Sequence, residues 1–325
     1  MEWKTRITEL FGCKYPILQG ALTGLGNWEF AAAISNTGAH GTITAAASHT
    51  PEKLREDIRR YRDATDDKPV SVNITVGSCP HEDEMVDAAL NEGIQVVETA
   101  AFNADKHGKR IKEAGSKWLH KTATVKHALH AEEHGADAVI IVGLEGIGFK
   151  NISQLTTMTT LLWAKKQIKV PIVIAGGLGD AYTFLGALAM GADGIMMGTR
   201  FMATKECPLS DHRKEAMVKA PPDHPQLKYA CLAMPEPKAY EEVMKLRDQM
   251  PLEKWLPRLE RVMLKETGWK DVPVMWAESS VQYLSGLQSM SVATIDDIPT
   301  CKELIDSIIH GAEEILDSWE FLKTR

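Results

Sequence analysis

Two glycine-rich turns carry the residues best suited to chemistry in this sequence. They are Gly176–Gly177 and Gly198–Thr199, and each follows a short apolar run. Glycines there let backbone N–H groups approach phosphate oxygens, and a following helix adds the positive end of its dipole. Asp180 is a good N-cap for a helix after the first turn. A single glycine turn would indicate only a tight connection, but two such turns favour a phosphate site.

The elements that position these turns follow a regular alternation. Apolar, β-branched runs alternate with amphipathic segments from near residue 15 to near residue 200. Eight such strands predict an α/β protein with a TIM (β/α)8 barrel, with a doubly wound sheet as the structural alternative. The predicted strands are Tyr15–Leu18, Gly41–Ala45, Val70–Thr75, Val96–Ala100, Lys117–Thr122, Ala138–Gly143, Ile172–Gly177 and Gly194–Gly198. Ligands of such barrels bind at the C-terminal strand ends, where both glycine turns lie.

The strand pattern stops near Lys205. Residues 205–288 are rich in Lys, Glu, Pro and Met, and we expect a helical insertion there that serves as a lid or a dimer contact. Its expected helices lie around Ala239–Gln249 and Leu252–Glu266. Thr300 is expected to cap a final helix that runs to about Leu322. Residues 1–204 and 289–325 therefore form the predicted barrel with its closing helix.

Composition narrows the class of protein. The 325 residues carry a net charge of −7 and no long Lys/Arg run, which disfavours a nucleic-acid partner. We find no apolar stretch long enough to cross a membrane, and the first residues are too charged for a signal peptide. Five cysteines without a CxxC pair are typical of reduced thiols. We expect a cytoplasmic enzyme with a small-molecule substrate, and a homodimer is left open.

Two other patterns are weaker than they look. The glycines in 143–148 and 20–26 follow strands, but they lack the GxGxxG order and the ribose-binding acid of a dinucleotide fold. His127, His130 and His134 lie near one helical face. Without a nearby carboxylate and cysteine set, we expect no metal site from them.

Eight segments spread over nearly the whole chain point to a known family. They are PILQGAL (16–22), SVNIT (71–75), VVETA (96–100), HKTATVKHAL (120–129), GADAVIIVGLEGIG (135–148), PIVIAGGLGD (171–180), GADGIMMGTRFMATKECP (191–208) and IDDIPTCKEL (295–304). With these motifs the sequence resembles the nitronate monooxygenase-like (2-nitropropane dioxygenase-like) family of FMN barrels. It is most similar to the bacterial NADH:quinone reductase branch, and the family also includes flavin-dependent enoyl-acyl-carrier-protein reductases.

The resemblance implies bound FMN and gives roles to particular residues. Lys121 would place a cation near N1 and O2 of the flavin ring, and Asn73 would hydrogen-bond the ring or the ribityl chain. A lysine in an apolar strand end is costly to bury unless it is paired. Glu98 either faces the barrel mouth or forms an ion pair inside the barrel. The turn residues implied to lie against the ring are Gln19, Gly20, Ala21 and Leu22, and those implied near the phosphate are Gly143, Gly148, Gly176, Gly177, Gly198 and Thr199.

The chain departs from the family pattern where the substrate is expected. Family members commonly carry a histidine after the sixth strand, whereas this chain has Phe149, followed by Lys150. A phenyl ring transfers no proton, so general acid–base catalysis from this position is lost. We expect Phe149, Lys150 and Leu22 to contact the substrate, and we assign no catalytic acid or base. A second departure is the segment 286–291, where the reductase branch tends to have a W-S-A-G-like loop.

The activity implied is an NAD(P)H-dependent reductase that passes hydride through FMN to a quinone or an enone-type acceptor. Hydride transfer to a quinone needs no strong protein base, so it tolerates the missing histidine. Three alternatives remain open at this point: a nitronate monooxygenase, an enoyl-thioester reductase and a flavin-binding protein without catalysis.

Overall fold

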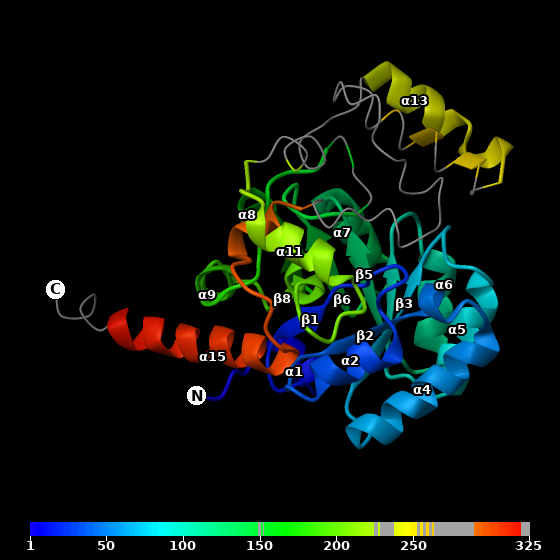
Figure 1. Ribbon diagram of the computed structural model, residues 1–325. Helices are drawn as coiled ribbons and strands as arrows, with labels where there is room; N and C mark the ends of the chain where they lie inside the picture. Colours follow the sequence, from blue (N-terminus) through cyan, green and yellow to red (C-terminus); the bar gives the residue numbers. More distant parts are fainter. Residues whose placement is uncertain are drawn as a thin grey trace.

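Eight parallel strands form a barrel with helices around it, which confirms the predicted (β/α)8 fold (Figure 1). The strands pair in the order β1-β8-β7-β6-β5-β4-β3-β2. They are β1 (Ile17–Gln19), β2 (Gly41–Thr44), β3 (Val70–Thr75), β4 (Val96–Ala100), β5 (Lys117–Thr122), β6 (Ala138–Val142), β7 (Ile172–Ala175) and β8 (Gly194–Met197). The computed structural model describes residues 1–148, 151, 153–223, 227, 237–251, 254–255, 258–259, 262 and 289–319.

The barrel closes between β1 and β2. The backbone N–H of His40 donates to the carbonyl of Ile17 at 2.9 Å, and the N–H of Gln19 donates to the carbonyl of His40 at 2.9 Å. The side-chain Oε1 of Gln19 then accepts from the N–H of Thr42 at 2.8 Å. Strand β1 also pairs with β8, so it has neighbours on both sides, which excludes an open doubly wound sheet.

The helices follow the strands in the expected alternation. They are α1 (Arg6–Phe11), α2 (Trp28–Ser35), α3 (Ala45–Ser48), α4 (Pro51–Thr65), α5 (Glu82–Asn91), α6 (Asp105–Glu113), α7 (Val125–Glu133), α8 (Thr157–Ala164), α9 (Ala181–Ala189), α10 (Thr199–Met202), α11 (Asp211–Lys219), α13 (Pro237–Lys245) and α15 (Cys301–Ser318), with the 3-10 turns η1 (Arg247–Gln249) and η3 (Met290–Thr294). Asp180 and Thr300 cap α9 and α15 as predicted, each through a capping box. Among the described residues, no helix has both the length and the apolar character needed to span a bilayer.

Apolar side chains fill both sides of the strands. Leu119, Ile140 and Val173 belong to an inner cluster, which also takes in Ile7 and Phe11 of α1. Alternate residues of the same strands belong to the larger outer cluster under the helices. This arrangement follows from the two-residue period of a strand, and it fixes which side chains face the interior of the barrel.

Two described residues of the late segment dock on the loop after β4. The rings of Phe102 and Trp255 lie 5.6 Å apart, and the Arg247 guanidinium lies 4.3 Å from the centre of the Phe102 ring. Trp255 donates its indole N–H to the carbonyl of Val243 in α13. Figure 1 shows α13 set apart from the barrel, on the side of α6 and α7. Of the expected second helix, 252–266, most residues lie outside the described part of the chain.

Candidate active site

Three polar side chains meet inside the barrel at the C-terminal strand ends. The Lys121 ammonium lies 3.1 Å from Oε1 of Glu98, and the amide of Asn73 donates to the same oxygen at 2.9 Å. Thr75 in turn donates its hydroxyl to Oδ1 of Asn73 at 3.0 Å. Adjacent strands β3, β4 and β5 supply these residues, because Asn73 is in register with Glu98 and Glu98 with Leu119. The sequence left open whether Glu98 faces the barrel mouth or forms an ion pair inside the barrel. The structure shows both, because Glu98 forms an ion pair at the barrel mouth.

Burial makes this trio a preorganised charge site. Glu98 and Asn73 are fully buried, whereas 18% of the Lys121 side chain is exposed. The second carboxylate oxygen of Glu98, Oε2, has no hydrogen-bond partner among the described residues. An unpaired buried carboxylate oxygen is costly. The Glu98 oxygen is therefore free to accept a hydrogen bond from a bound group, and Lys121 is the part of the trio that reaches solvent.

The second part of the candidate site is the turn after β7, where Gly176 leaves a surface without side-chain bulk that we call the glycine floor. It has φ +105°, and a Cβ at this position would lie 2.9 Å from both the backbone N of Gly146 and Oγ1 of Thr157. Only glycine combines that backbone conformation with so close an approach. The sequence motif pointed to Gly176 but missed Gly146, which packs directly against it.

Gly20 and Gly198 meet in the same way across β1 and β8. A Cβ on Gly20 would lie 3.2 Å from the α-carbon of Gly198, and Gly20 donates its N–H to the carbonyl of Met197 at 2.8 Å. Leu22 is buried, and its Cδ2 would lie 3.6 Å from a Cβ on Gly198. Together with Thr199, which is buried at the start of α10, these residues bring the first and last strand ends together.

A distant segment bonds to the turns after β6 and β7. The hydroxyl of Ser291 accepts the N–H of Gly177 at 3.0 Å, and the hydroxyl of Ser289 donates to the carbonyl of Glu145 at 2.8 Å. The Glu145 carboxylate accepts from the N–H and the hydroxyl of Thr157. Sequence reasoning missed both serines as site residues. Their only signal was the departure from the W-S-A-G-like loop in 286–291.

The remaining predicted site residues differ in their surroundings: some are packed in the site, and others are exposed or lie outside the described residues. Gly143 is required for packing, since a Cβ there would lie 2.1 Å from Oγ1 of Thr157. Gly148 has φ +137°, is exposed, and faces open space. Gln19 uses its side chain in barrel closure, although its Nε2 is buried without a partner among the described residues. Ala21 follows it in the turn. Phe149 and Lys150 lie outside the described residues.

The residues present fit FMN. The glycine contacts at Gly176 and at Gly20–Gly198 form a floor with little side-chain bulk, which suits a phosphate held by backbone and hydroxyl groups. Lys121 supplies a cation on the opposite strands, and Glu98 has an oxygen without a partner among the described residues. The glycine floor and the hydroxyls suit the phosphate of such a cofactor, and the fixed cation suits its redox-active ring.

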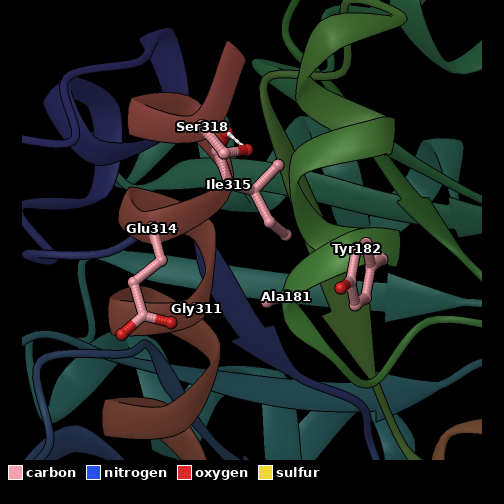
Figure 2. A pocket seen from close by; sticks show the side chains of 6 residues that line it. All are labelled: Ala181, Tyr182, Gly311, Glu314, Ile315 and Ser318. Carbon is pink, nitrogen blue, oxygen red and sulfur yellow. Dashed lines mark hydrogen bonds between the residues drawn. The ribbon is translucent and has the colours of Figure 1, made fainter.

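A second hollow lies on the outside of the barrel between α9 and α15 (Figure 2). Its volume is about 390 Å³, and Tyr182, Glu314 and Ile315 are among the residues that line it. The hydroxyl of Ser318 at its edge already donates to the carbonyl of Ile315. It offers one carboxylate and no described cation or glycine floor, so we place the active site at the barrel mouth.

The whole chain has recognisable relatives. A (3aS,4S,5R,7aS)-5-hydroxy-7a-methyl-1-oxo-octahydro-1H-indene-4-carboxyl-CoA dehydrogenase of Mycobacterium tuberculosis is 29% identical over 96% of this chain and 97% of its own length. A probable nitronate monooxygenase of Staphylococcus saprophyticus is 28% identical over 67% of this chain and 73% of its own. The structure of FabK from Thermotoga maritima superposes with a TM-score of 0.77 at 28% identity, covering 98% of this chain and 99% of that one.

The sequence profile of the nitronate monooxygenase family matches residues 4–311, which include every strand of the barrel and both sides of the candidate site. Enzymes of this family typically depend on FMN, and the fit of the barrel mouth to that cofactor agrees with the match. The chain therefore belongs to the nitronate monooxygenase family and is a flavin-dependent oxidoreductase.

Proposed function

We propose that this protein is an FMN-dependent oxidoreductase whose substrate is a coenzyme A thioester. Relatives named as carboxyl-CoA dehydrogenases, from M. tuberculosis and Rhodococcus jostii, align with 96% and 97% of this chain. The staphylococcal nitronate monooxygenase relatives align with about two thirds of it. Full-length similarity includes the segments outside the barrel, where substrate selectivity is expected to reside, and this favours the thioester.

The buried trio is the observation that carries the redox part of the proposal. FMN, when bound, supplies reversible hydride transfer to or from a substrate carbon. Glu98 holds the Lys121 ammonium at 3.1 Å, and Asn73 fixes Glu98 from the other side. A cation held in place before reaction stabilises negative charge that develops beside it, without reorganisation at the moment of transfer. The Lys121 ammonium would therefore stabilise the negative charge that develops beside it during hydride transfer.

The thioester corresponds to the enoyl-thioester alternative that the sequence left open, and not to the quinone or enone-type acceptor that the resemblance implied. The carbonyl of an α,β-unsaturated thioester withdraws charge from the adjacent double bond, so hydride would go to the β-carbon and the α-carbon would take a proton from solvent water. A quinone lacks the coenzyme A moiety that appears in the names of the two full-length relatives. We therefore propose the thioester as the carbon substrate, and NAD(P)H as the hydride donor in the reductive direction.

Nitronate oxidation is the second candidate, and the family name and the staphylococcal relatives favour it. Phe149 opposes it, because a phenyl ring in the usual histidine position cannot remove a proton from a nitroalkane. This candidate therefore requires a substrate that arrives already as the nitronate anion.

Steady-state assays with the FMN-loaded protein separate these candidates. NADH or NADPH oxidation is followed anaerobically with cinnamoyl-CoA or benzoquinone as acceptor, and oxygen uptake is followed with propyl nitronate. The proposal predicts a higher kcat/KM with cinnamoyl-CoA than with benzoquinone. Turnover of propyl nitronate without thioester turnover would replace the proposal with the second candidate.

A further inference from the structure

A cluster of metal-binding side chains lies between two outer helices. Asp105 begins α6, and His130 and His134 lie one turn apart at the end of α7. One ligand atom from each residue lies within 4.8 Å of the other two. The sequence suggested no metal site because it showed no carboxylate and cysteine set near the histidines, but the barrel brings in Asp105 from 25 residues away. We propose that Asp105, His130 and His134 bind a divalent transition-metal ion of the Zn²⁺ type.

The orientation of His134 supports this assignment. Its Nδ1 lies 2.7 Å from the backbone carbonyl oxygen of His130, which can only accept, so Nδ1 carries the ring proton. Its other ring nitrogen, Nε2, faces Oδ2 of Asp105, 3.8 Å away. Metal-binding histidines are typically held in this way, with one nitrogen donating to a carbonyl and the other on the metal.

The spacing of the three ligand atoms suits an ion of this size. Oδ2 of Asp105 lies 2.9 Å from Nε2 of His130 and 3.8 Å from Nε2 of His134. A tetrahedral Zn²⁺ ion with bonds of about 2.0–2.1 Å keeps its ligand atoms roughly 3.4 Å apart, between these two distances. Both imidazole side chains are 44% exposed, so the fourth position is open to water. Nitrogen and oxygen ligands of this kind favour Zn²⁺, Co²⁺ or Ni²⁺ over Mg²⁺ or Ca²⁺.

Asn103 holds the carboxylate in place. Its amide donates to Oδ2 of Asp105 at 2.9 Å, and its Oδ1 accepts the backbone N–H of Asp105 at 2.8 Å. Such partners fix a ligand without touching the metal, and their loss weakens metal binding about 10–100-fold. The cluster thus contains three ligands and one positioning residue, and a bound ion would join α6 to α7.

The test uses the untagged, FMN-loaded protein, stripped with a chelator that is then removed. Co²⁺ is titrated and its visible absorbance followed, since tetrahedral nitrogen and oxygen coordination gives an intense band, and Zn²⁺ is titrated by calorimetry. We expect one ion per chain in the wild type, and a Kd raised about 10-fold or more in Asn103→Ala and further in His134→Ala and His130→Ala. His127→Ala is the matched control, because His127 is an exposed histidine of the same helix that is not among the three ligands. It should bind as the wild type does.

Circular dichroism of each variant checks that the fold is retained. The proposal is overturned if the wild type binds neither ion at millimolar concentration. It is equally overturned if His134→Ala binds both ions as tightly as the wild type, which would mean adventitious binding elsewhere on the chain.

Discussion

Lys121 is the residue on which the proposed chemistry depends most. Its sequence context, an apolar strand end, predicted that it must be paired, and the structure supplies Glu98 as the partner at 3.1 Å. The sequence could not show this pair, because the two residues are 23 positions apart and meet only through the register of β4 and β5. A buried carboxylate and a lysine that reaches solvent make the ammonium a fixed charge at the barrel mouth.

Replacing Lys121 with methionine keeps most of the side-chain length and removes the charge. We expect the rate of flavin reduction or reoxidation by substrate to fall by about 10²–10³-fold, the usual loss on removing one preorganised stabilising group. Stopped-flow absorbance at saturating substrate measures this rate. Lys117→Met is the matched control, since Lys117 begins the same strand and faces the same way. Equal rates in the wild type and Lys121→Met would show that the charge has no part in hydride transfer.

At the scale of elements, the sequence predicted the barrel well because the strands are mostly buried on both faces and helices such as α4 and α6 are amphipathic. The predicted bounds of β3, β4 and β5 agree with the structure, while β1 starts two residues later, at Ile17. The site was harder to predict. Gly146 and the serines of 289–291 act through contacts between distant turns, such as the bond from Gly177 to Ser291 over 114 positions. No local pattern encodes such a contact.

A substitution of Gly176 tests the role of the glycine floor between β6 and β7. A Gly176→Ala substitution forces a side chain into a backbone conformation with φ +105° and against Gly146. We expect a loss of about 1–3 kcal/mol in the free energy of unfolding, and weaker FMN binding. Gly186→Ala, within α9 and with no atom within 4 Å of the new Cβ, should be neutral or stabilising by up to about 1 kcal/mol. Chemical denaturation and fluorescence titration with FMN measure the two effects, and unchanged FMN affinity in Gly176→Ala would remove this turn from the cofactor site.

The segment 205–288 is proposed to act as a lid, and its described contacts allow a test. Phe102 lies beside Ala101, whose N–H donates to the carbonyl of Lys121, and its ring contacts Trp255 and Arg247. Phe102→Ala should raise the KM for the thioester several-fold with a smaller change in kcat, because the lid is less firmly docked. Tyr182→Ala, which removes an exposed ring elsewhere, is the control. An unchanged KM in Phe102→Ala would contradict the role of the segment as a lid. The expectation that remains is a dimer contact.

At the scale of the whole molecule, two buried histidines make stability depend on pH. Burial lowers the pKa of His40, at the barrel closure, to about 4, and it lowers the pKa of His120 in β5 to about 4. In the unfolded chain both have a pKa of about 6.5. Below that pH the unfolded state binds protons that the folded state does not, so stability falls from about pH 6.5 towards about pH 4.

Each buried histidine is expected to lower the free energy of unfolding by about 2 kcal/mol between pH 7 and pH 5. Urea denaturation at the two pH values measures the difference. In His120→Gln that difference should shrink by about 2 kcal/mol, whereas His212→Gln, on the exposed face of α11, should leave it unchanged. If His120→Gln loses as much stability as the wild type, His120 is not kept neutral by the fold.

We propose that the barrel mouth holds a flavin that exchanges hydride with a coenzyme A thioester. The most direct measurement is anaerobic, single-turnover absorbance of the FMN-loaded protein, first reduced and then mixed with cinnamoyl-CoA. We expect full return of the oxidised flavin spectrum in one saturable phase, slowed about 10²–10³-fold in Lys121→Met. Flavin that stays reduced with the thioester, yet reoxidises rapidly with benzoquinone, would contradict the thioester assignment.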